Sequence, residues 1–312
     1  MQTVITLTMN PALDKSSSVE QVIAERKLHC KSPNFEPGGG GINVSRAMRK
    51  LGGESTMIFP YGGATGDSLL KLLGQDRLTC LAIPVEGRTR ENLVVLEEST
   101  GRQYRFGMPG PPLGDEEWQR CLNALAESRE KPAYIVASGS LPPGVPDDFY
   151  AQVARIGKDL GARVVIDSSG EPLRHALQEG IYLIKPNIRE LGELIGHEPA
   201  DDVTPEKIAM ELVRSGRSTI VALSLGAGGV LLASPDGSER LRAPVVPIKS
   251  KVGAGDSMVA GIVLSLARGN SLPEAIRFGV AAGAAAVMTP GSELCRREDV
   301  ERLYEQLSKS KD

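Results

Sequence analysis

The segment from Lys251 to Ser257 reads Lys-Val-Gly-Ala-Gly-Asp-Ser and leads directly into an apolar helical pattern. At the start of a helix, unpaired backbone N–H groups can surround a phosphate, and small residues let them approach it closely: Gly253, Ala254 and Gly255. A carboxylate beside such a site repels the anion, unless it takes a proton from the group that attacks the phosphorus. Asp256 is therefore a candidate base. The competing interpretation is a glycine-rich turn whose aspartate caps the helix.

A second glycine-rich element, Gly38 to Gly41, also leads into a helical pattern. Four consecutive glycines are costly in backbone entropy, which favours a close approach of the backbone to a ligand over a plain turn. Asn43 follows and would add an amide suited to sugar hydroxyls. The chain has no Walker A motif and no complete Gly-x-Gly-x-x-Gly after a strand. The ordinary nucleotide folds and a dinucleotide oxidoreductase are therefore disfavoured.

The elements that position these residues alternate along the chain between short β-branched runs and amphipathic helical patterns. This alternation predicts an α/β fold in three layers, α/β/α, with a mostly parallel central sheet. We expect strands at Val4–Leu7, Met57–Phe59, Tyr134–Ala137, Val164–Asp167, Tyr182–Lys185, Ile220–Leu223 and Val230–Ala233. We expect helices at Ile42–Leu51, Ser68–Leu73, Glu116–Ser128, Phe149–Leu160, Pro205–Arg214, Asp256–Arg268, Pro273–Met288 and Asp299–Leu307.

Two segments interrupt this alternation, roughly residues 12–33 and 86–108, and they show polar, alternating β character. We interpret them as a small β-sheet lid inserted into one domain that spans residues 1–312. The lid would carry Leu93, Val95 and Phe106 on edge strands. Because exposed apolar edge strands favour association, we expect the same lid of a second subunit to cover them in a homodimer.

The composition excludes several classes of protein. The 312 residues hold 36 basic and 39 acidic side chains, a net charge of −3, which gives no strong field for nucleic acid or an anionic membrane. Four dispersed cysteines and three histidines form no zinc pattern, and reduced thiols indicate a cytoplasmic protein. Neither a signal peptide nor a membrane-spanning segment is indicated.

The two glycine-rich motifs, with Lys185-Pro-Asn-x-x-Glu190 between them, resemble those of the PfkB, or ribokinase-like, family of carbohydrate kinases. The resemblance covers nearly the whole chain and includes the opening residues Thr6 to Asp14 and the segment Ser138 to Gly144. Both segments are typical of members that phosphorylate sugar phosphates. The order of the motifs along the chain is that of the family.

The resemblance implies that Asp256 accepts the sugar hydroxyl proton while the Gly253, Ala254 and Gly255 amides stabilise the transferring phosphoryl group of ATP. Lys185 and Asn187 resemble triphosphate contacts, and Glu190 would hold Mg²⁺ directly or through water. Further family nucleotide contacts match Ser224, Gly226, Gly228, Gly229, Val252, Val280 and Ala284. A hairpin turn would also explain the glycines, and helix packing would also explain Val280 and Ala284. A potassium site would match the carbonyls near Ser250, Val252, Ala286, Thr289 and Gly291.

For the sugar, the resemblance implies Asp14, Asn43 and the backbone of Gly39 and Gly40. A phosphate already on the substrate needs cations or hydroxyls, for which the candidates are Lys27, Arg90, Arg105 and Ser140. The competing interpretation is a solvated lid with ordinary surface charges.

The residue at position 40 bears on the choice of substrate within the family. The 1-phosphofructokinases and tagatose-6-phosphate kinases usually carry lysine where this chain has Gly40. The resemblance is therefore strongest to the 6-phosphofructokinases, and it implies transfer from ATP to the 1-hydroxyl of fructose 6-phosphate. The alternatives are the tagatose-6-phosphate and fructose-1-phosphate activities and, in another class, a catalytically silent sugar-phosphate or nucleotide sensor.

Overall fold

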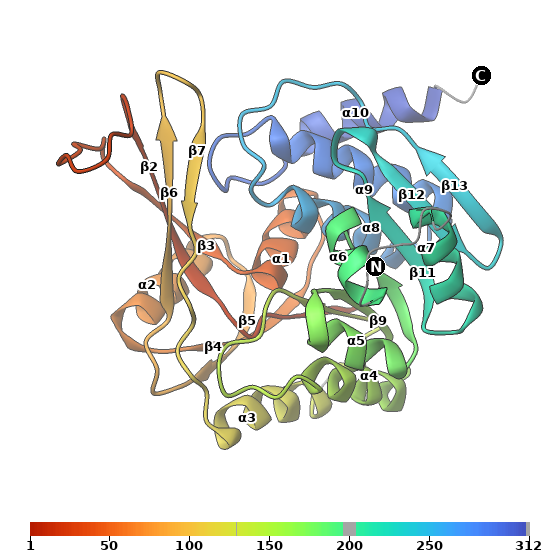
Figure 1. Ribbon diagram of the computed structural model, residues 1–312. Helices are drawn as coiled ribbons and strands as arrows, with labels where there is room; N and C mark the ends of the chain where they lie inside the picture. Colours follow the sequence, from red (N-terminus) through yellow and green to blue (C-terminus); the bar gives the residue numbers. More distant parts are fainter. Residues whose placement is uncertain (129, 196–203, 310–312) are drawn as a thin grey trace.

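A nine-stranded sheet forms the centre of the computed structural model, which describes residues 1–128, 130–195 and 204–309. The strand order is β13-β12-β11-β10-β9-β8-β1-β4-β5, and the antiparallel pairs are β11 with β12 and β12 with β13. Figure 1 shows the sheet with helices packed against it. The strands are β1 (Val4–Leu7), β4 (Thr56–Tyr61), β5 (Thr79–Pro84), β8 (Tyr134–Ser138), β9 (Arg163–Asp167), β10 (Ile181–Ile184), β11 (Ser218–Ser224), β12 (Val230–Ser234) and β13 (Gly237–Leu241).

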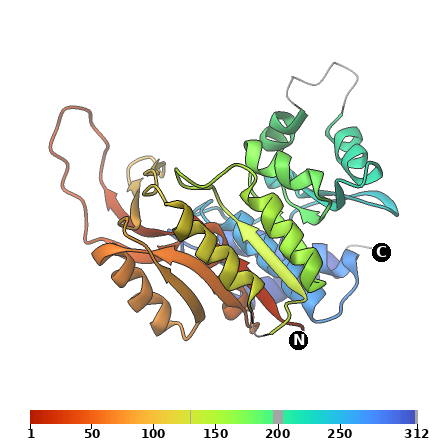
Figure 2. The same ribbon diagram turned by 90° about the horizontal axis from the view of Figure 1, so that it is seen from below.

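Helices cover both faces of this sheet, because alternate residues of the central strands enter two separate cores. Val136 and Val165 pack with α8 and α9, whereas Ile135 and Ile166 pack with α3 and α4. One layer holds α1 (Gly40–Lys50), α2 (Gly63–Gln75), α8 (Ala254–Ala267), α9 (Leu272–Val287) and α10 (Arg297–Lys309). The other holds α3 (Asp115–Ala126), α4 (Phe149–Leu160), α5 (Gly170–Gln178), α6 (Ile188–Ile195) and α7 (Pro205–Arg214). Helices α3 and α4 of this layer are near the viewer in Figure 2. The predicted three-layer arrangement is confirmed.

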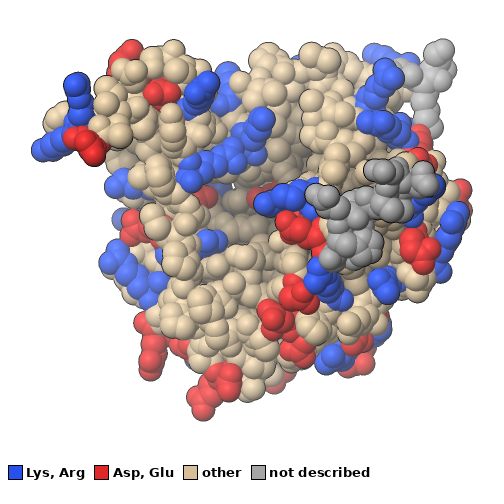
Figure 3. Space-filling model, viewed as in Figure 1, with Lys and Arg blue, Asp and Glu red and all other residues tan. Residues whose placement is uncertain are grey.

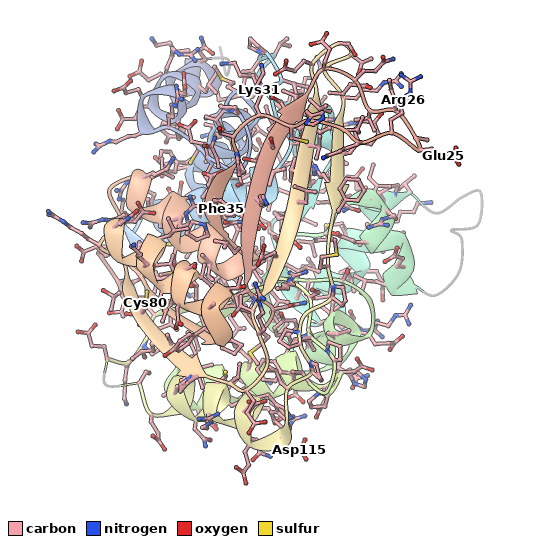
Figure 4. The ribbon with its side chains drawn as sticks, turned by 90° about the vertical axis from the view of Figure 1, so that its left-hand side faces the viewer. Glu25, Arg26, Lys31, Phe35, Cys80 and Asp115 are labelled. Atoms are coloured by element: carbon pink, nitrogen blue, oxygen red, sulfur yellow. The ribbon has the colours of Figure 1, made fainter. Side chains whose placement is uncertain are left out.

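A separate four-stranded sheet stands at one side of the molecule and forms the lid (Figure 1). Its order is β3-β2-β6-β7, with β2 (Ala12–Val19) parallel to β6 (Arg90–Glu97) and antiparallel to β3 (Asn34–Gly38). The fourth strand is β7 (Gln103–Phe106). The predicted lid segments 12–33 and 86–108 contain β2, β6 and β7, while β3 lies just beyond the first of them. Figure 4 looks onto this sheet, with Phe35 labelled on β3 and with Glu25 and Arg26 in the loop that extends from it.

Helix α8 is buried along nearly its whole length, from Ser257 to Ala267. It packs closely on α9, since a Cβ at Gly261 would lie 2.9 Å from the Cα of Gly279. Among the residues that the structure describes, no helix has both the length and the apolarity needed to cross a bilayer.

Candidate active site

Asp256 lies in the first turn of α8, directly after a sharp left-handed bend. Gly253 precedes the helix with φ of 70°, and a Cβ there would come 2.3 Å from Cδ2 of Leu294. The Asn43 side chain, on the first turn of α1, donates from Nδ2 to Oδ2 of Asp256 at 2.9 Å. Asn43 and Asp256, which follow the two glycine-rich segments, are therefore in contact. The spacing of the two segments in the sequence did not indicate this contact.

Burial sets the protonation of this carboxyl. It raises the pKa of Asp256 to about 6, with the nearby Asp167 charge adding to the rise. The Asn43 hydrogen bond and the Lys185 charge lower the pKa in part. A carboxyl that titrates near neutrality is well matched to general-base catalysis, and it is ionised above that pH.

A cleft of about 330 Å³ opens in front of Asp256, and it lies at the carboxyl ends of β8, β9 and β10. In an open α/β sheet, this edge is where ligands bind. Figure 3 shows the hollow near the centre of the molecule, with Lys and Arg side chains along its upper rim. The lining residues are Gly40, Ser138, Gly139, Ser140, Asp167, Ser168, Ser169, Glu190 and Asp256. Four of the predicted site residues thus share one cavity: Gly40, Ser140, Glu190 and Asp256.

Lys185 directly follows β10 and is 7% exposed. Burial alone would lower its pKa, but the Asp167 carboxylate at 3.2 Å holds the pKa above its ordinary value, so the side chain stays charged. A Cβ at Gly255 would lie 3.3 Å from Nζ of Lys185, so this cation sits beneath the start of α8. Asp167 stands in no motif and was not among the predicted site residues, although it is the polar residue that ends the predicted strand Val164–Asp167.

Asn187 and Glu190 form a reciprocal pair at the start of α6. The Asn187 N–H donates to Oε2 of Glu190, and the Glu190 N–H donates to Oδ1 of Asn187, both at 2.9 Å. Glu190 also lines the cleft. Mg²⁺ in a nucleotide complex needs only one or two carboxylates in addition to phosphates and waters, so Glu190 fits that role. Within the described ranges, no cluster of three or more acidic, His or Cys side chains could hold a metal alone.

The close approach of Gly40 to the loop after β8 leaves no room for a side chain. A Cβ at Gly40 would lie 2.2 Å from Oγ of Ser138 and 2.9 Å from the backbone N of Gly139. We expect Gly40→Ala to push the start of α1 away from this loop and to lower kcat/KM by about 10²-fold. Steady-state kinetics measure this effect. Gly74→Ala in α2, which meets nothing within 4 Å, is the control, and equal kinetics for the two variants would contradict the expectation.

Asp14 lies on the lid strand β2, where it accepts a hydrogen bond from Nδ2 of Asn92 at 2.8 Å. Burial raises the pKa of Asp14, against the effects of Asn92 and of the Arg90 and Arg46 charges. Asn92 was not singled out in the sequence, yet it lies opposite Asp14 on β6. The Asp14 charge contributes to the raised pKa of Asp256, which indicates that the lid carboxyl is near the base.

Of the predicted phosphate-binding residues, Lys27, Arg90 and Arg105 lie on the lid, and Ser140 lies in the loop after β8. Arg90 donates to the carbonyls of Asn10 and Met108, both at 2.9 Å, and its Nε is buried with no hydrogen-bond partner. Ser140 accepts from Nδ2 of Asn10 at 3.1 Å. Lys27 and Arg105 are exposed, and no hydrogen bond or ion pair among the described residues joins them to each other or to Arg90. Their role toward a phosphate stays a prediction.

The predicted nucleotide contacts are not among the residues that line the cleft, and packing explains several of them. The Ser224 N–H donates to the carbonyl of Pro186, which places the β11 turn beside Asn187. Gly226 to Gly228 form a 3₁₀ turn, and a Cβ at Gly229 would lie 2.0 Å from the Leu241 carbonyl oxygen. Val280 and Ala284 are buried in the core of α8 and α9. Contacts of these residues with a nucleotide remain predictions.

The carbonyls predicted to hold potassium come from two neighbouring segments. The Ser250 N–H donates to the carbonyl of Val287 at 3.2 Å, and the Val252 N–H donates to Oγ of Ser250 at 3.2 Å. Thr289 Oγ donates to the carbonyl of Ala286 at 2.8 Å, and Gly291 has φ of 59°. The segments that carry these carbonyls therefore adjoin one another, as a shared cation site would require.

The pKa of Asp256 sets an expectation for the pH dependence. Protonated Asp256 cannot accept the sugar proton, so we expect kcat/KM to fall as the pH drops through about 6 and to be constant just above it. A pH profile of the coupled assay for ADP measures this limb. If kcat/KM instead fell only near the ordinary pKa of an aspartate, this would contradict the assignment of Asp256 as the base.

Comparisons with known proteins identify relatives of this chain. Residues 3–299 match the model of the pfkB family carbohydrate kinases. The chain is 45% identical over 302 residues to ATP-dependent 6-phosphofructokinase isozyme 2 of Mycobacterium tuberculosis, covering 97% of this chain and 89% of that protein. It superposes on a crystal structure of Escherichia coli phosphofructokinase-2 in complex with potassium with a TM-score of 0.94, at 43% identity over 99% of this chain and 100% of that one.

The same fold is seen in a Thermotoga maritima ribokinase, 20% identical, with a TM-score of 0.78 over 98% of this chain and all of that one. The predicted ribokinase-like architecture is thereby confirmed. Because the family model matches residues 3–299, almost the entire length of the sequence, the chain belongs to the PfkB family of carbohydrate kinases.

Proposed function

We propose that this kinase transfers the γ-phosphoryl group of ATP to the 1-hydroxyl of fructose 6-phosphate, giving fructose 1,6-bisphosphate and ADP. The observation that carries the proposal is the position of Asp256: a carboxyl of raised pKa at the N-terminus of α8 and at the wall of the cleft. The 45% identity to an ATP-dependent 6-phosphofructokinase isozyme supports the choice of reaction.

The mechanism follows from the residues around the cleft. Asp256 accepts the proton of the sugar 1-hydroxyl as its oxygen attacks the γ-phosphorus. The Gly253, Ala254 and Gly255 amides, at the positive end of the α8 dipole, stabilise the charge on the transferring group. Lys185, charged and held by Asp167, lies beside these amides and balances the triphosphate charge. Mg²⁺, held by Glu190 directly or through water, would neutralise phosphate charge.

The sugar lies between the two sheets in this proposal. Asp14 on β2 and Asn43 on α1 bind its hydroxyls, while the closing lid excludes water from the phosphoryl group. Arg90, Arg105, Lys27 and Ser140 are the candidates for the sugar phosphate. Potassium at the carbonyls of residues 250–252 and 286–291 is part of the proposal, supported by the potassium complex of the Escherichia coli relative.

The substrate is tested by comparing kcat/KM for fructose 6-phosphate, fructose 1-phosphate and tagatose 6-phosphate. We expect fructose 6-phosphate to be preferred, because position 40 is glycine and because a 1-phosphofructokinase relative is only 33% identical. Tagatose 6-phosphate differs at one hydroxyl and is expected to be the slower substrate by about 10-fold to 10³-fold. A preference for fructose 1-phosphate would overturn the assignment.

We further propose that the protein is a cytoplasmic homodimer, joined through the lid. Phe35, Phe106 and Met108 are 44%, 48% and 47% exposed on or beside the lid strands, where a second lid would cover them. A structure of the Escherichia coli relative is described as a tetrameric inhibited form, so that protein assembles beyond a monomer.

We expect light scattering at micromolar concentration to give the mass of a dimer, and Phe106→Glu to shift it to a monomer because a charge would be buried in the interface. Glu301→Gln, on the exposed face of α10, is the control and is expected to leave the mass unchanged. A parent protein that is monomeric with both ligands bound would contradict the dimer.

A further inference from the structure

The lid places two carboxylates directly opposite each other. Asp14 on β2 pairs in register with Glu36 on β3, so both side chains leave the same face of the lid sheet. Like charges in this arrangement repel each other and destabilise a sheet, unless a nearby cation balances them. The lid therefore needs a positive partner on this face.

Arg46 of α1 supplies that partner. The residue is 7% exposed. Its Nη2 lies 3.5 Å from Oε1 of Glu36, and its Nη1 donates to the carbonyl of Pro37 at 2.8 Å. The Arg46 charge also lowers the pKa of Asp14. One buried guanidinium thus holds the strand β3 and balances both lid carboxylates.

The same guanidinium reaches the residue that contacts the base. Nη1 of Arg46 lies 3.5 Å from Oδ1 of Asn43, whose Nδ2 donates to Asp256. An asparagine amide can take two orientations, but a guanidinium only donates, so Arg46 favours the one in which Oδ1 faces it. That orientation is the one that directs the N–H of Asn43 toward the base.

Glu36 extends the network to the loop between α9 and α10. Its Oε2 accepts from Oγ of Ser292 at 2.6 Å and from the Ser292 N–H at 3.2 Å. Ser292 is 3% exposed and follows the segment that carries the predicted cation carbonyls. Movement of β3 away from α1 would break these contacts and those of Arg46 together.

We propose that Arg46 is a positioning residue for phosphoryl transfer, which holds the lid carboxylates against α1 and fixes the Asn43 amide that hydrogen-bonds the base. The position of the lid thereby controls the orientation of Asp256. This inference rests on the proposed sugar-phosphate kinase activity, but the role of Arg46 belongs to no motif in that proposal.

The test compares Arg46→Met, Arg46→Lys and the control Arg49→Met, a neighbour on α1 whose side chain is 43% exposed. For Arg46→Met we expect KM for fructose 6-phosphate to rise and kcat to fall, each about tenfold, with KM for ATP unchanged. Arg46→Lys keeps the charge without the planar fork, so it is expected to restore KM but not kcat. Arg49→Met is expected to match the parent.

The acid limb of the kcat/KM profile separates positioning from a purely structural role. The groups that act on Asp256 are Asp167 on β9, Lys185 directly after β10, Asp14 on β2 and Asn43 on α1, and all four remain in the variants. Loss of the fixed Asn43 amide should therefore move this limb upward by about half a pH unit. An unchanged limb with parental kcat, and only a lower melting temperature, would overturn the proposal.

The kinetics of Arg46→Lys and the calorimetric binding of fructose 6-phosphate test the role of Arg46 even if Arg46→Met is unstable or inactive. If Arg46→Met does not fold, Arg46→Lys carries the test, since a loss of kcat at the parental melting temperature supports the proposal and a parental kcat refutes it. Calorimetric binding of fructose 6-phosphate needs no turnover, and weaker binding by Arg46→Met is expected. Activity of the parent is measured first, so failure of the proposed function would be seen independently of Arg46.

Discussion

Asp256→Asn is expected to lower kcat by about 10²-fold to 10⁴-fold, because asparagine cannot accept the proton of the sugar hydroxyl. The amide keeps the size of the side chain and the acceptor oxygen for Nδ2 of Asn43, so the cleft should keep its shape. Binding of ATP and fructose 6-phosphate is expected to persist. A coupled assay for ADP and calorimetry measure the two quantities separately.

The same substitution should stabilise the fold at neutral pH. Because burial raises the pKa of Asp256 to about 6, the folded protein binds this proton more tightly than the unfolded chain does. Ionisation of the carboxyl above that pH destabilises the fold by up to about 3 kcal/mol, a cost that a neutral amide avoids. We expect a higher melting temperature for Asp256→Asn at pH above 6, with the difference disappearing as the pH falls toward the ordinary pKa of aspartate.

Asp67→Asn removes an exposed carboxylate from α2 and is the matched control for both measurements. It should change neither kcat nor the melting temperature by more than the experimental error. If Asp256→Asn kept the activity of the parent, the carboxyl would not be the base, and the kinase mechanism proposed above would fail at its first step.

Lys185→Met is the second substitution with a large expected effect. It leaves Asp167, whose side chain is 15% exposed, without the ammonium group that now lies 3.2 Å away. Removing one partner of a buried ion pair costs about 3 kcal/mol of stability. Loss of the cation beside the α8 amides should also lower kcat/KM by about 10²-fold or more. Chemical denaturation and steady-state kinetics measure these effects.

The double variant Lys185→Met with Asp167→Asn separates stability from catalysis. A neutral pair of similar size should recover most of the lost stability, whereas the activity should stay low because the triphosphate still lacks its cation. Lys158→Met, a 55% exposed lysine paired with Glu179, is the control and should change little. Full activity of the single variant would exclude Lys185 from the nucleotide site.

Much of the central sheet could be predicted because its strands and helices show clear periodicity. The observed strand Val4–Leu7 and the helices Phe149–Leu160 and Pro205–Arg214 have the predicted bounds. The sequence did not indicate β5 and β13, which are sheet edges with half-exposed or polar residues. Helix α5 was also missed, since it is short and carries Gly170 and Pro172 in its first turn.

The site likewise contains residues that stand in short sequence motifs and residues whose partners are distant in the sequence. Asp256, Asn43, Lys185 and Glu190 stand in short motifs, so their types and spacing identified them. Asp167 and Arg46 depend on partners brought together by the sheet and the lid, and neither stands in a motif. The parallel pairing of β2 with β6 likewise joins strands far apart in the sequence, and so periodicity alone could not reveal it.

The burial of α8 determines which part of the molecule moves during turnover. The helix that carries Asp256 is enclosed from Ser257 to Ala267 and pressed against α9 through paired glycines, so it cannot shift without opening the core. The lid sheet contacts α1 and α2, but most residues of β2 and β6 are only partly buried. In the proposed reaction we therefore expect the lid strands to move rather than the backbone of α8, so that the rate of lid closure sets an upper limit on turnover.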